Sequence, residues 1–379
     1  MVTGDGLLRI PLSGPALRRR VLALGVETRN RPAAAADTTI TLWEPQGDLG
    51  DPALRQDWTR RLEAGRTALD PERLVVDLHP DMVPTLLGRA RAAAWGLPVQ
   101  AVQHHHAHAA AVMAEQGLEA CLALVFDGFG WGPDGRLWGA ELLHLQGVAC
   151  RRLGSFAPVP LPGGDAAVRQ PLRQLVARLD DAGVELDAAL RRRWGLDEPA
   201  VRVWRHQCHT GLNSPLTHGA GRLFDAMAAL LGLAPATVSQ SGAAAVALEQ
   251  AALRARGEPR FPDPPFALRE ADGLLLVDWR ESFRRLAGQN ILPDDRPRWA
   301  LGFHRAVARA AAALAEHGAD QVPERDLVLS GGVFLNRLLG PLLAEALSPR
   351  GWRIRQAQRV PTGDAGIAVG QAWIGGGRA

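Results

Sequence analysis

The chain has 379 residues and a formal net charge of +3, with 47% hydrophobic and 22% charged residues. This composition is typical of a globular protein with two domains or with two lobes of one fold. The sequence contains no run of about 18 apolar residues that could span a membrane, and its start lacks the apolar stretch of a cleavable signal peptide. We therefore expect a cytoplasmic protein that does not contact membranes.

The sequence contains arginine but no lysine. The absence of lysine excludes a Walker-type phosphate lysine and a lysine Schiff base. The arginines occur in short, scattered runs that are typical of solvated faces, so nucleic acid is not an expected partner. Cys121, Cys150 and Cys208 form no CxxC pair, and we expect free thiols.

The first part of the chain predicts alternating strands and helices. VLALG, residues 21–25, is an apolar strand that runs into a glycine turn, and TTITLW, residues 38–43, is expected to be its antiparallel return. The elements predicted next are a helix at 51–65, a strand at 73–80, a helix at 82–96, a short strand at 98–103 and a helix that carries four histidines.

The pattern restarts near residue 121. CLALVFDGFG, residues 121–130, again leads from an apolar strand into a glycine turn, much as residues 21–30 do. This similarity indicates an internal duplication. Residues 165–320 are predicted to be mostly helical, and alternating strands and helices return after residue 326.

The segment QHHHAH, residues 103–108, is the first candidate site. His104 and His108 are four residues apart, so they share one face of the predicted helix and can offer neutral imidazole nitrogens to a single ion. His105 and His106 are expected to point elsewhere. Because histidines on a helix surface show the same spacing, a metal site also needs an anionic ligand.

Two aspartates could supply that ligand. Asp127 ends a predicted strand and Asp364 begins a predicted helix, which are the places where α/β folds bind ligands. Taken singly, either could be a helix-capping or turn residue. Two histidines with one or two carboxylates would suit zinc or ferrous iron.

A third signal is LSGGVFLN, where Ser330, Gly331 and Gly332 join a predicted strand to a helix. The glycines would let backbone N–H groups approach a phosphate or an adenosine. A plain strand-to-helix turn has the same pattern, so both interpretations stay open.

Seven motifs in order resemble the C-terminal portion of the HypF family, the carbamoyltransferases of nickel–iron hydrogenase maturation. The resemblance covers residues 19–375 and implies an α/β, two-lobed, actin-like and sugar-kinase-like ATPase fold of the Kae1-like type. It places lobe I at 17–118 and lobe II at 119–379, with the helical insertion at about 165–320. The motifs are DLHPD, VQHHHAHAAAVMAE, FDGFGWGPDGRLWGAE, LPGGDAA, NSPLTHGAGRLFDAMAALLG, LSGGVFLNR and VPTGDAGIAVGQA.

The resemblance also implies roles for individual residues. His104, His108 and Asp364 would hold a divalent metal, zinc or iron, at the nucleotide phosphates, with Asp127 beside the same centre. Arg29 would contact the carbamoyl or phosphate oxygens. The residues implied on the nucleotide side are Gly128, Gly221, Arg222, Asp225, Ser330, Gly331, Gly332 and Asn336.

The reaction implied is transfer of a carbamoyl group from carbamoyladenylate, which contains the AMP moiety of ATP, to the C-terminal cysteine of HypE. The thiocarboxamide formed there later becomes cyanide. Full-length HypF also carries an acylphosphatase-like domain, a zinc-finger pair and a YrdC-like domain, and the chain lacks the room and the cysteines for them. We therefore expect a transfer portion that relies on a separate YrdC-type enzyme for carbamoyladenylate.

The sequence departs from the family on the nucleotide side. Ser241 replaces an acidic residue, His218 and Gly219 replace serines, and Arg29 replaces a lysine. HQCH, residues 206–209, could bind a metal but is also typical of a helix surface. The open alternatives are a tRNA threonylcarbamoyl transferase, an O-carbamoyltransferase that acts on a small molecule, and a non-catalytic scaffold that binds HypE.

Overall fold

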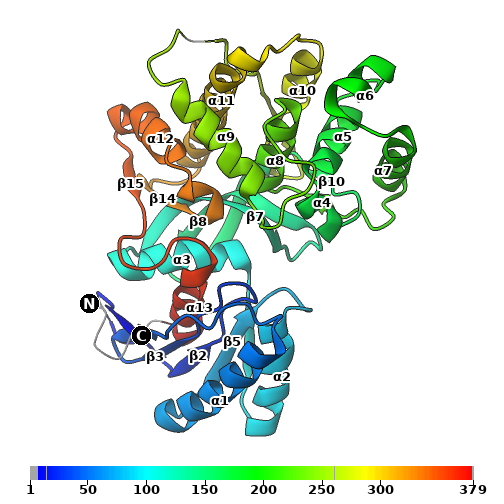
Figure 1. Cartoon of the computed structure of the whole chain (residues 1–379). Helices are drawn as coiled ribbons and strands as arrows, with labels where there is room; N and C mark the ends of the chain where they lie inside the picture. The colour runs from blue at the N-terminus through cyan, green and yellow to red at the C-terminus, as the bar shows by residue number, and fades with distance from the viewer. Residues whose placement is uncertain (1–6, 14, 260, 378–379) are drawn as a thin grey trace.

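The computed structural model describes residues 7–13, 15–259 and 261–377. Two β-sheets are stacked with two helices between them, and further helices cover their outer faces (Figure 1). The first sheet comes from the N-terminal part of the chain, and the second comes from the middle and C-terminal parts.

The first sheet has the strand order β1-β4-β3-β2-β5-β6. Its central strand β2 runs parallel to β5 on one side and antiparallel to β3 on the other. Trp58 and Leu62 of helix α1 and Ala92 of helix α2 are buried against its outer face. The bounds are β1 Leu8–Pro11, β2 Val21–Ala23, β3 Ala33–Ala36, β4 Thr39–Leu42, α1 Pro52–Leu69, β5 Arg73–Asp77, α2 Val83–Trp95 and β6 Val99–Val102.

One predicted pairing in this sheet is wrong. The return strand β4 pairs with β3 and β1 and does not pair with β2. Strand β3 consists of four alanines, which lack the β-branched and aromatic side chains that mark a strand in a sequence. Its backbone is held instead by ladder hydrogen bonds to β2 and β4.

The second sheet repeats the arrangement of the first. Its central strand β7 is antiparallel to β8, which pairs with β9, and is parallel to β14, which pairs with β15. The order β9-β8-β7-β14-β15 matches β4-β3-β2-β5-β6, so the predicted duplication is confirmed. The bounds are β7 Ala120–Trp131, β8 Leu137–Gln146, β9 Ala149–Phe156, β14 Asp326–Ser330, α12 Leu339–Leu347 and β15 Arg353–Arg355.

The last helix of each half crosses over to the other half. Helix α3 (His104–Gln116) follows the first sheet in sequence but packs on β7, β14 and β8 of the second. Helix α13 (Ile367–Gly376) follows the second sheet but packs on β2, β3 and β5 of the first. Both helices are rich in small residues, and a Cβ added at Gly370 would lie 1.8 Å from the Ala107 carbonyl oxygen. The helices therefore meet backbone to backbone in one core shared by both sheets.

Residues 165–320 form the helical layer on the outer face of the second sheet (Figure 1). The segment also contributes short strands, two of which extend that sheet beyond β9. The helices are α4 Asp165–Arg169, α5 Pro171–Asp181, α6 Ala188–Trp194, α7 Glu198–Thr210, α8 Ala220–Leu230, α9 Ala243–Arg254, α10 Arg280–Ala287 and α11 Arg296–Ala319, and the strands are β11 Leu216–Thr217, β12 Ala267–Ala271 and β13 Leu274–Asp278. The strand β10 (Val159–Pro160) pairs with β11.

In the described part of the chain, no helix combines the length and the apolar character that crossing a bilayer requires. Cys121, Cys150 and Cys208 are free thiols, as expected.

Candidate metal centre

The two candidate histidines lie in the first turns of helix α3. The Gln103 side chain caps this helix by accepting a hydrogen bond from the His106 backbone N–H at 2.9 Å. His104 and His108 are 3% and 2% exposed, so their rings are inside the protein and face the second sheet rather than solvent. Their ring centroids are 4.9 Å apart, as their spacing on one helix face requires.

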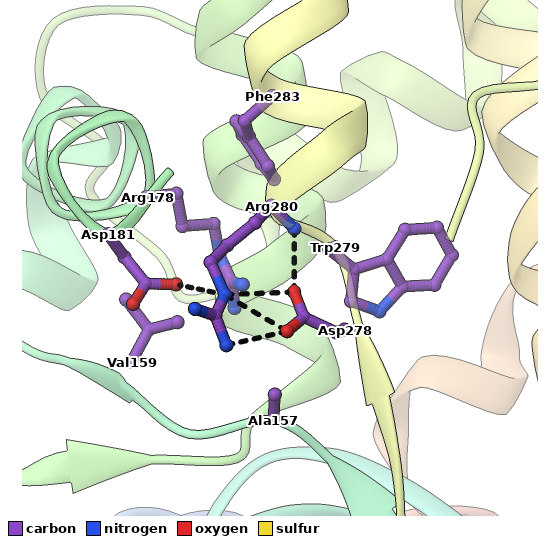
Figure 2. Close-up of a pocket in the computed structure, with 8 residues that line it drawn as sticks. All are labelled: Ala157, Val159, Arg178, Asp181, Asp278, Trp279, Arg280 and Phe283. Atoms are coloured by element: carbon purple, nitrogen blue, oxygen red, sulfur yellow. Dashed lines mark hydrogen bonds and ion pairs between the residues drawn. The ribbon is translucent and has the colours of Figure 1, made fainter. Parts of the chain in front are cut away.

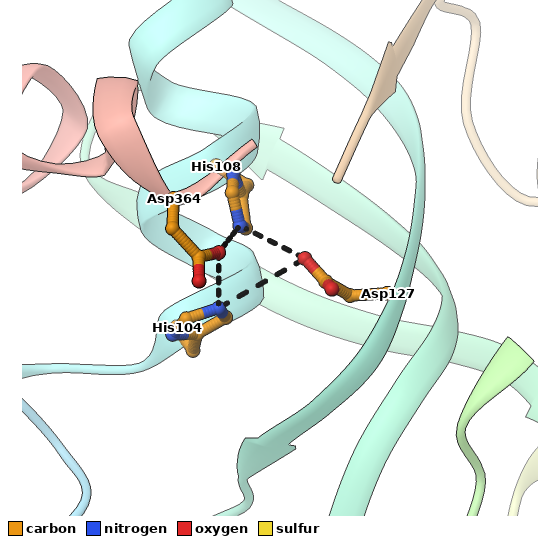
Figure 3. Close-up of side chains that lie close together, drawn as sticks. All are labelled: His104, His108, Asp127 and Asp364. Atoms are coloured by element: carbon orange, nitrogen blue, oxygen red, sulfur yellow. Dashed lines mark ion pairs between the residues drawn. The ribbon is translucent and has the colours of Figure 1, made fainter. Parts of the chain in front are cut away.

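Two carboxylates from distant segments meet these imidazoles (Figure 3). Asp127 lies in β7, and its Oδ2 is 3.2 Å from Nε2 of His108 and 4.0 Å from Nε2 of His104. Asp364 lies just before α13, and its Oδ1 is 3.6 Å and 3.7 Å from the same two nitrogens. One ligand atom from each of the four residues lies within 4.8 Å of the others. No other group of three or more such ligands gathers in the described part of the chain.

Backbone and hydroxyl groups hold the two carboxylates in place. Asp127 accepts hydrogen bonds from the backbone N–H groups of Gly128 at 2.7 Å and Gly332 at 3.1 Å. Thr28, in the turn after β2, donates its hydroxyl to Asp364 at 3.3 Å. The corresponding turns of the two duplicated halves thus both supply groups to one centre.

Asp77 is a partner of the candidate metal ligands that the sequence did not single out. It ends strand β5, is fully buried, and its Oδ2 is 2.9 Å from Nδ1 of His104. A carboxylate on one ring nitrogen fixes the ring orientation and directs the other nitrogen toward an ion. The available signal was the position of Asp77 at the carboxyl end of β5, which runs parallel to β2 and β6. The expectation that Asp127 ends its strand is wrong, because β7 continues to Trp131 through an irregular stretch of its ladder with β8.

The electrostatics of the cluster favour cations. Burial by itself lowers the pKa of His104, but the nearby carboxylates of Asp364 and Asp77 outweigh it and hold that pKa well above its ordinary value. Burial opposes the same change at His108, where Asp127 and Asp364 nevertheless raise the pKa. Burial would raise the pKa of both Asp127 and Asp364, and the imidazoles lower it instead. The carboxylates are therefore charged, and their charge is balanced by protonated imidazoles or, in their place, by a bound cation.

The donor set fits a divalent zinc or iron ion. Nε2 of His108 is buried and makes no hydrogen bond of acceptable geometry, although Asp127 lies close to it. Buried polar atoms without partners are rare, and this one faces two carboxylates, as a ligand to a cation would. Two imidazoles and two carboxylates are common ligands of both metals.

The neighbouring histidines do not join the cluster. His105 is fully buried and its Nδ1 is 3.0 Å from the Gln103 side-chain amide. Burial lowers the pKa of His105 well below its ordinary value and lowers that of His106 to about 4. Both rings are therefore neutral at pH 7. The HQCH segment lies on α7, where His209 pairs with Asp180 at 2.7 Å, away from the four ligands.

The glycine turn after β14 lies directly beside the metal candidates. Gly331 has a φ of +93°, and an added Cβ would lie 2.3 Å from the Phe126 carbonyl oxygen, so this position requires glycine. Ser330 donates its hydroxyl to the His108 carbonyl oxygen at 3.1 Å. The turn is thereby fixed to the same helix that carries the histidines.

Asn336 has its hydrogen-bonding groups engaged within the protein. Its Oδ1 accepts from the Leu338 backbone N–H at 2.9 Å, and its Nδ2 lies 3.0 Å from Nε2 of the buried His304. Nδ1 of His304 is 2.8 Å from the Ala300 carbonyl oxygen, so it carries the proton and Nε2 accepts. Asn336 therefore shapes the turn. Like Asp77, His304 is a partner of a predicted site residue that the sequence did not indicate.

The start of helix α8 packs against the glycine turn at Gly128, next to Asp127. A Cβ added at Gly221 would lie 3.1 Å from the Gly128 Cα, and Arg222 Nη2 would be 3.7 Å from a Cβ at Gly128. Arg222 and Asp225 are both buried and form an ion pair at 2.9 Å. Gly128, Gly221 and Arg222 are thus neighbours of Asp127.

The positions that depart from the family differ in their surroundings. A Cβ at Gly219 would lie 2.2 Å from the Gly128 carbonyl oxygen, so a serine there would need the backbone to shift. His218 is buried, with its Nδ1 2.7 Å from the Phe156 carbonyl oxygen, and Ser241 is exposed. Arg29 is exposed, has a φ of +50° and makes no hydrogen bond or ion pair within the described residues.

A separate small cavity lies between α5, α10 and β13 (Figure 2). Arg178 points into it, and burial lowers the pKa of this guanidinium to about 10. The cavity holds about 10 Å³, which is room for roughly one water molecule. It is far too small for a nucleotide or a carbamoyl donor.

The repeated strand order, the crossed terminal helices and the polar cluster between the sheets define a two-lobed, actin-like α/β ATPase fold of the Kae1-like type. Residues 16–115 match the HypF Kae1-like domain, and residues 123–371 match the second subdomain of the carbamoyltransferase Kae1-like domain. The chain belongs to the HypF carbamoyltransferase family.

Individual relatives agree with this family assignment. The chain is 34% identical to carbamoyltransferase HypF2 of Cupriavidus necator over 97% of its own length and 47% of that protein. It is 36% identical to a carbamoyltransferase HypF homolog of the same organism over 93% of its length and 91% of that protein. Full-length HypF, solved in a phosphate- and nucleotide-bound form, matches 98% of the chain with a TM-score of 0.85 and 26% identity. The chain spans about half of that structure and of HypF2.

Proposed function

We propose that this protein transfers a carbamoyl group from carbamoyladenylate to the C-terminal cysteine of HypE in the cytoplasm, as a step of cyanide-ligand synthesis for nickel–iron hydrogenase. The observation that carries the proposal is the meeting of His104, His108, Asp127 and Asp364 beside two glycine-rich turns. Membership of the HypF family and the nucleotide-bound form of its structural neighbour support it.

The four ligands would hold a zinc or iron ion. When bound, that ion would supply a positive charge for the phosphate of the donor and so assist departure of AMP. Within the chain, Asp77 keeps the proton of His104 on Nδ1, which leaves the Nε2 lone pair free for the ion. The amides of Gly128 and Gly332 keep Asp127 oriented toward the same point.

The flanking turns would bind the nucleotide part of the donor. Gly331 and Gly332 lie on one side of Asp127, and Gly221 and Arg222 lie on the other. Small residues at these positions allow the backbone to approach phosphate or ribose closely. Exposed Arg29, next to Thr28, is proposed to contact carbamoyl or phosphate oxygens.

No nucleophile from this chain is required, because the partner supplies a thiolate. The cysteine sulfur of HypE forms a bond to the carbamoyl carbon. The bond from that carbon to the phosphate oxygen breaks, and AMP leaves with the electron pair. A separate YrdC-type enzyme would form the carbamoyladenylate.

Mass spectrometry of HypE tests this function. HypE is incubated with this protein, carbamoyl phosphate and ATP, with and without a YrdC-type enzyme. We expect one added carbamoyl group only when the YrdC-type enzyme is present. The double variant His104→Ala and His108→Ala should abolish the gain, whereas the control His206→Ala and His209→Ala on α7 should retain it.

Two outcomes would contradict the proposal. A gain without the YrdC-type enzyme would mean that this chain activates carbamate itself. No gain under either condition, with both proteins folded, would reject transfer to HypE.

A further inference from the structure

One carboxylate outside the cluster is placed to control its geometry. Glu115 lies near the C-terminal end of α3, and its side chain is 4% exposed. It accepts hydrogen bonds from three consecutive backbone N–H groups, those of Gln358 at 3.1 Å, Arg359 at 2.6 Å and Val360 at 3.2 Å. No other side chain of α3 accepts hydrogen bonds from as many backbone N–H groups of another segment within the described residues.

The segment that Glu115 holds leads directly to a ligand. Only Pro361, Thr362 and Gly363 separate Val360 from Asp364. Gly363 has a φ of +79°, and a Cβ at Gly366 would lie 2.1 Å from the Pro361 carbonyl oxygen, so the connection is tight. Val360 is itself 4% exposed and packs in the shared core. The position of Asp364 therefore follows closely from the position of Val360.

Helix α3 is thus connected to the centre in two ways. Its first turns carry His104 and His108, and its last turn fixes the approach of Asp364 through Glu115. Neighbouring contacts reinforce the second connection, since the Gln116 side chain donates to the Gln356 carbonyl oxygen and Arg359 lies 3.6 Å from the Glu115 carboxylate. On the other side of Asp364, α13 is fixed against α3 by the close contact of Gly370 with Ala107.

We propose that Glu115 is a positioning residue of the metal centre: by holding the backbone of Gln358–Val360 on α3, it sets the distance between Asp364 and the two imidazoles. This inference rests on the proposed metal centre. Hydrogen bonds from N–H groups to a charged acceptor are strong, and three of them on one buried carboxylate leave the segment little freedom. Groups that orient ligands without touching the ion commonly change metal affinity by about 10–100-fold.

The test measures zinc affinity by competition with a chromophoric chelator, in full-length wild type, Glu115→Gln, Asp364→Asn and the double variant. Glu115→Gln should weaken binding by about 10-fold or more. Because Glu115 acts through Asp364, it should have little further effect in the Asp364→Asn background. The cobalt(II)-loaded protein should show a changed visible spectrum in Glu115→Gln. Asp180→Asn, a carboxylate of similar burial that ion-pairs with Arg205, is the matched control and should keep wild-type affinity and spectrum.

Hydrogen exchange in the metal-free protein gives an independent readout. Glu115→Gln should raise exchange at residues 356–364, and Asp180→Asn should not. Wild-type zinc affinity and cobalt spectrum in both Glu115→Gln and Glu115→Ala would overturn the proposal. So would a loss of zinc affinity from Glu115→Gln in the Asp364→Asn background that equals its loss in the wild-type background. If wild type bound no metal while exchange still rose, the metal centre itself would fail and the positioning role with it, although the contact of Glu115 with its segment would stand.

Discussion

At the scale of single residues, His104 faces carboxylates on both sides of its ring. Asp77 binds Nδ1, and Nε2 faces Asp127 and Asp364. Replacing Asp77 with Asn should weaken zinc binding by about 10–100-fold, because the ring loses the carboxylate that fixes its orientation. Competition with a chelator measures this effect. The control Asp51→Asn changes only the exposed cap of α1 and should leave affinity unchanged.

The raised histidine pKa values predict that metal and protons compete. The pKa of His104 lies well above 6.5 and that of His108 is also raised, so both rings hold protons in the metal-free protein near pH 6.5. Binding must release these protons, and metal affinity should rise with pH until the pH exceeds the raised pKa of His104, and then level off. Calorimetry at pH 7 in buffers of different ionisation enthalpy should find about one to two protons released. No dependence on the buffer would contradict the assigned protonation.

The residues of the centre differ in how well the sequence marks them. His104 and His108 stand out by spacing, and Asp127 and Asp364 by their places at a predicted strand end and a predicted helix start, although β7 in fact continues past Asp127. Asp77 ends a strand as well but does not stand out, and Glu115 carries no mark, since an aspartate at a strand end and a glutamate at a helix end are common. Their roles depend on which segments meet in three dimensions. The nucleotide-side roles of Gly221, Arg222 and the other residues implied there stay predictions.

At the scale of elements, the contact of α3 with α13 has no room for a side chain. Gly370→Ala should destabilise the protein by about 1–3 kcal/mol or more, because the added Cβ meets the Ala107 backbone. It should also weaken zinc binding, since ligands precede or lie on both helices. Urea unfolding and chelator competition measure the two effects. Gly340→Ala in α12, whose Cβ meets nothing closer than 3.5 Å, should change stability by less than about 1 kcal/mol.

Elements with a strong local signal were predicted from the sequence, and those defined by their partners were not. The helix predicted at 51–65, which is α1, the mostly helical character of residues 165–320 and the central strands of both sheets follow from periodicity and apolar runs. Strand β3 was missed because alanine favours no sheet, and the pairing of β4 was wrong for the same reason. The crossing of α3 and α13 was also not predicted, because both helices are apolar on most sides and do not indicate which sheet they cover.

At the scale of the whole molecule, the crossed helices predict that the two halves depend on each other. The expected lobe boundary at 118 and 119 assigns α3 to lobe I, yet α3 packs on the second sheet and α13 on the first. Residues 1–118 and 119–379 expressed separately should therefore each expose an apolar face, bind a hydrophobic dye and aggregate. Co-expression should restore a soluble complex that binds zinc. Two separately folded, soluble fragments would contradict the shared core.

The crossing of α13 also has a consequence for synthesis on the ribosome. The inner face of the first sheet, with Val21, Ala23, Ile40 and Val75, is complete in sequence by residue 102, but its cover is residues 367–376. At translation rates of roughly 5–20 residues per second, this face waits on the order of tens of seconds for the helix that protects it. We therefore expect chaperones that shield apolar surface to bind the nascent chain. A product that terminates anywhere before α13 would keep the apolar inner face of its first sheet exposed.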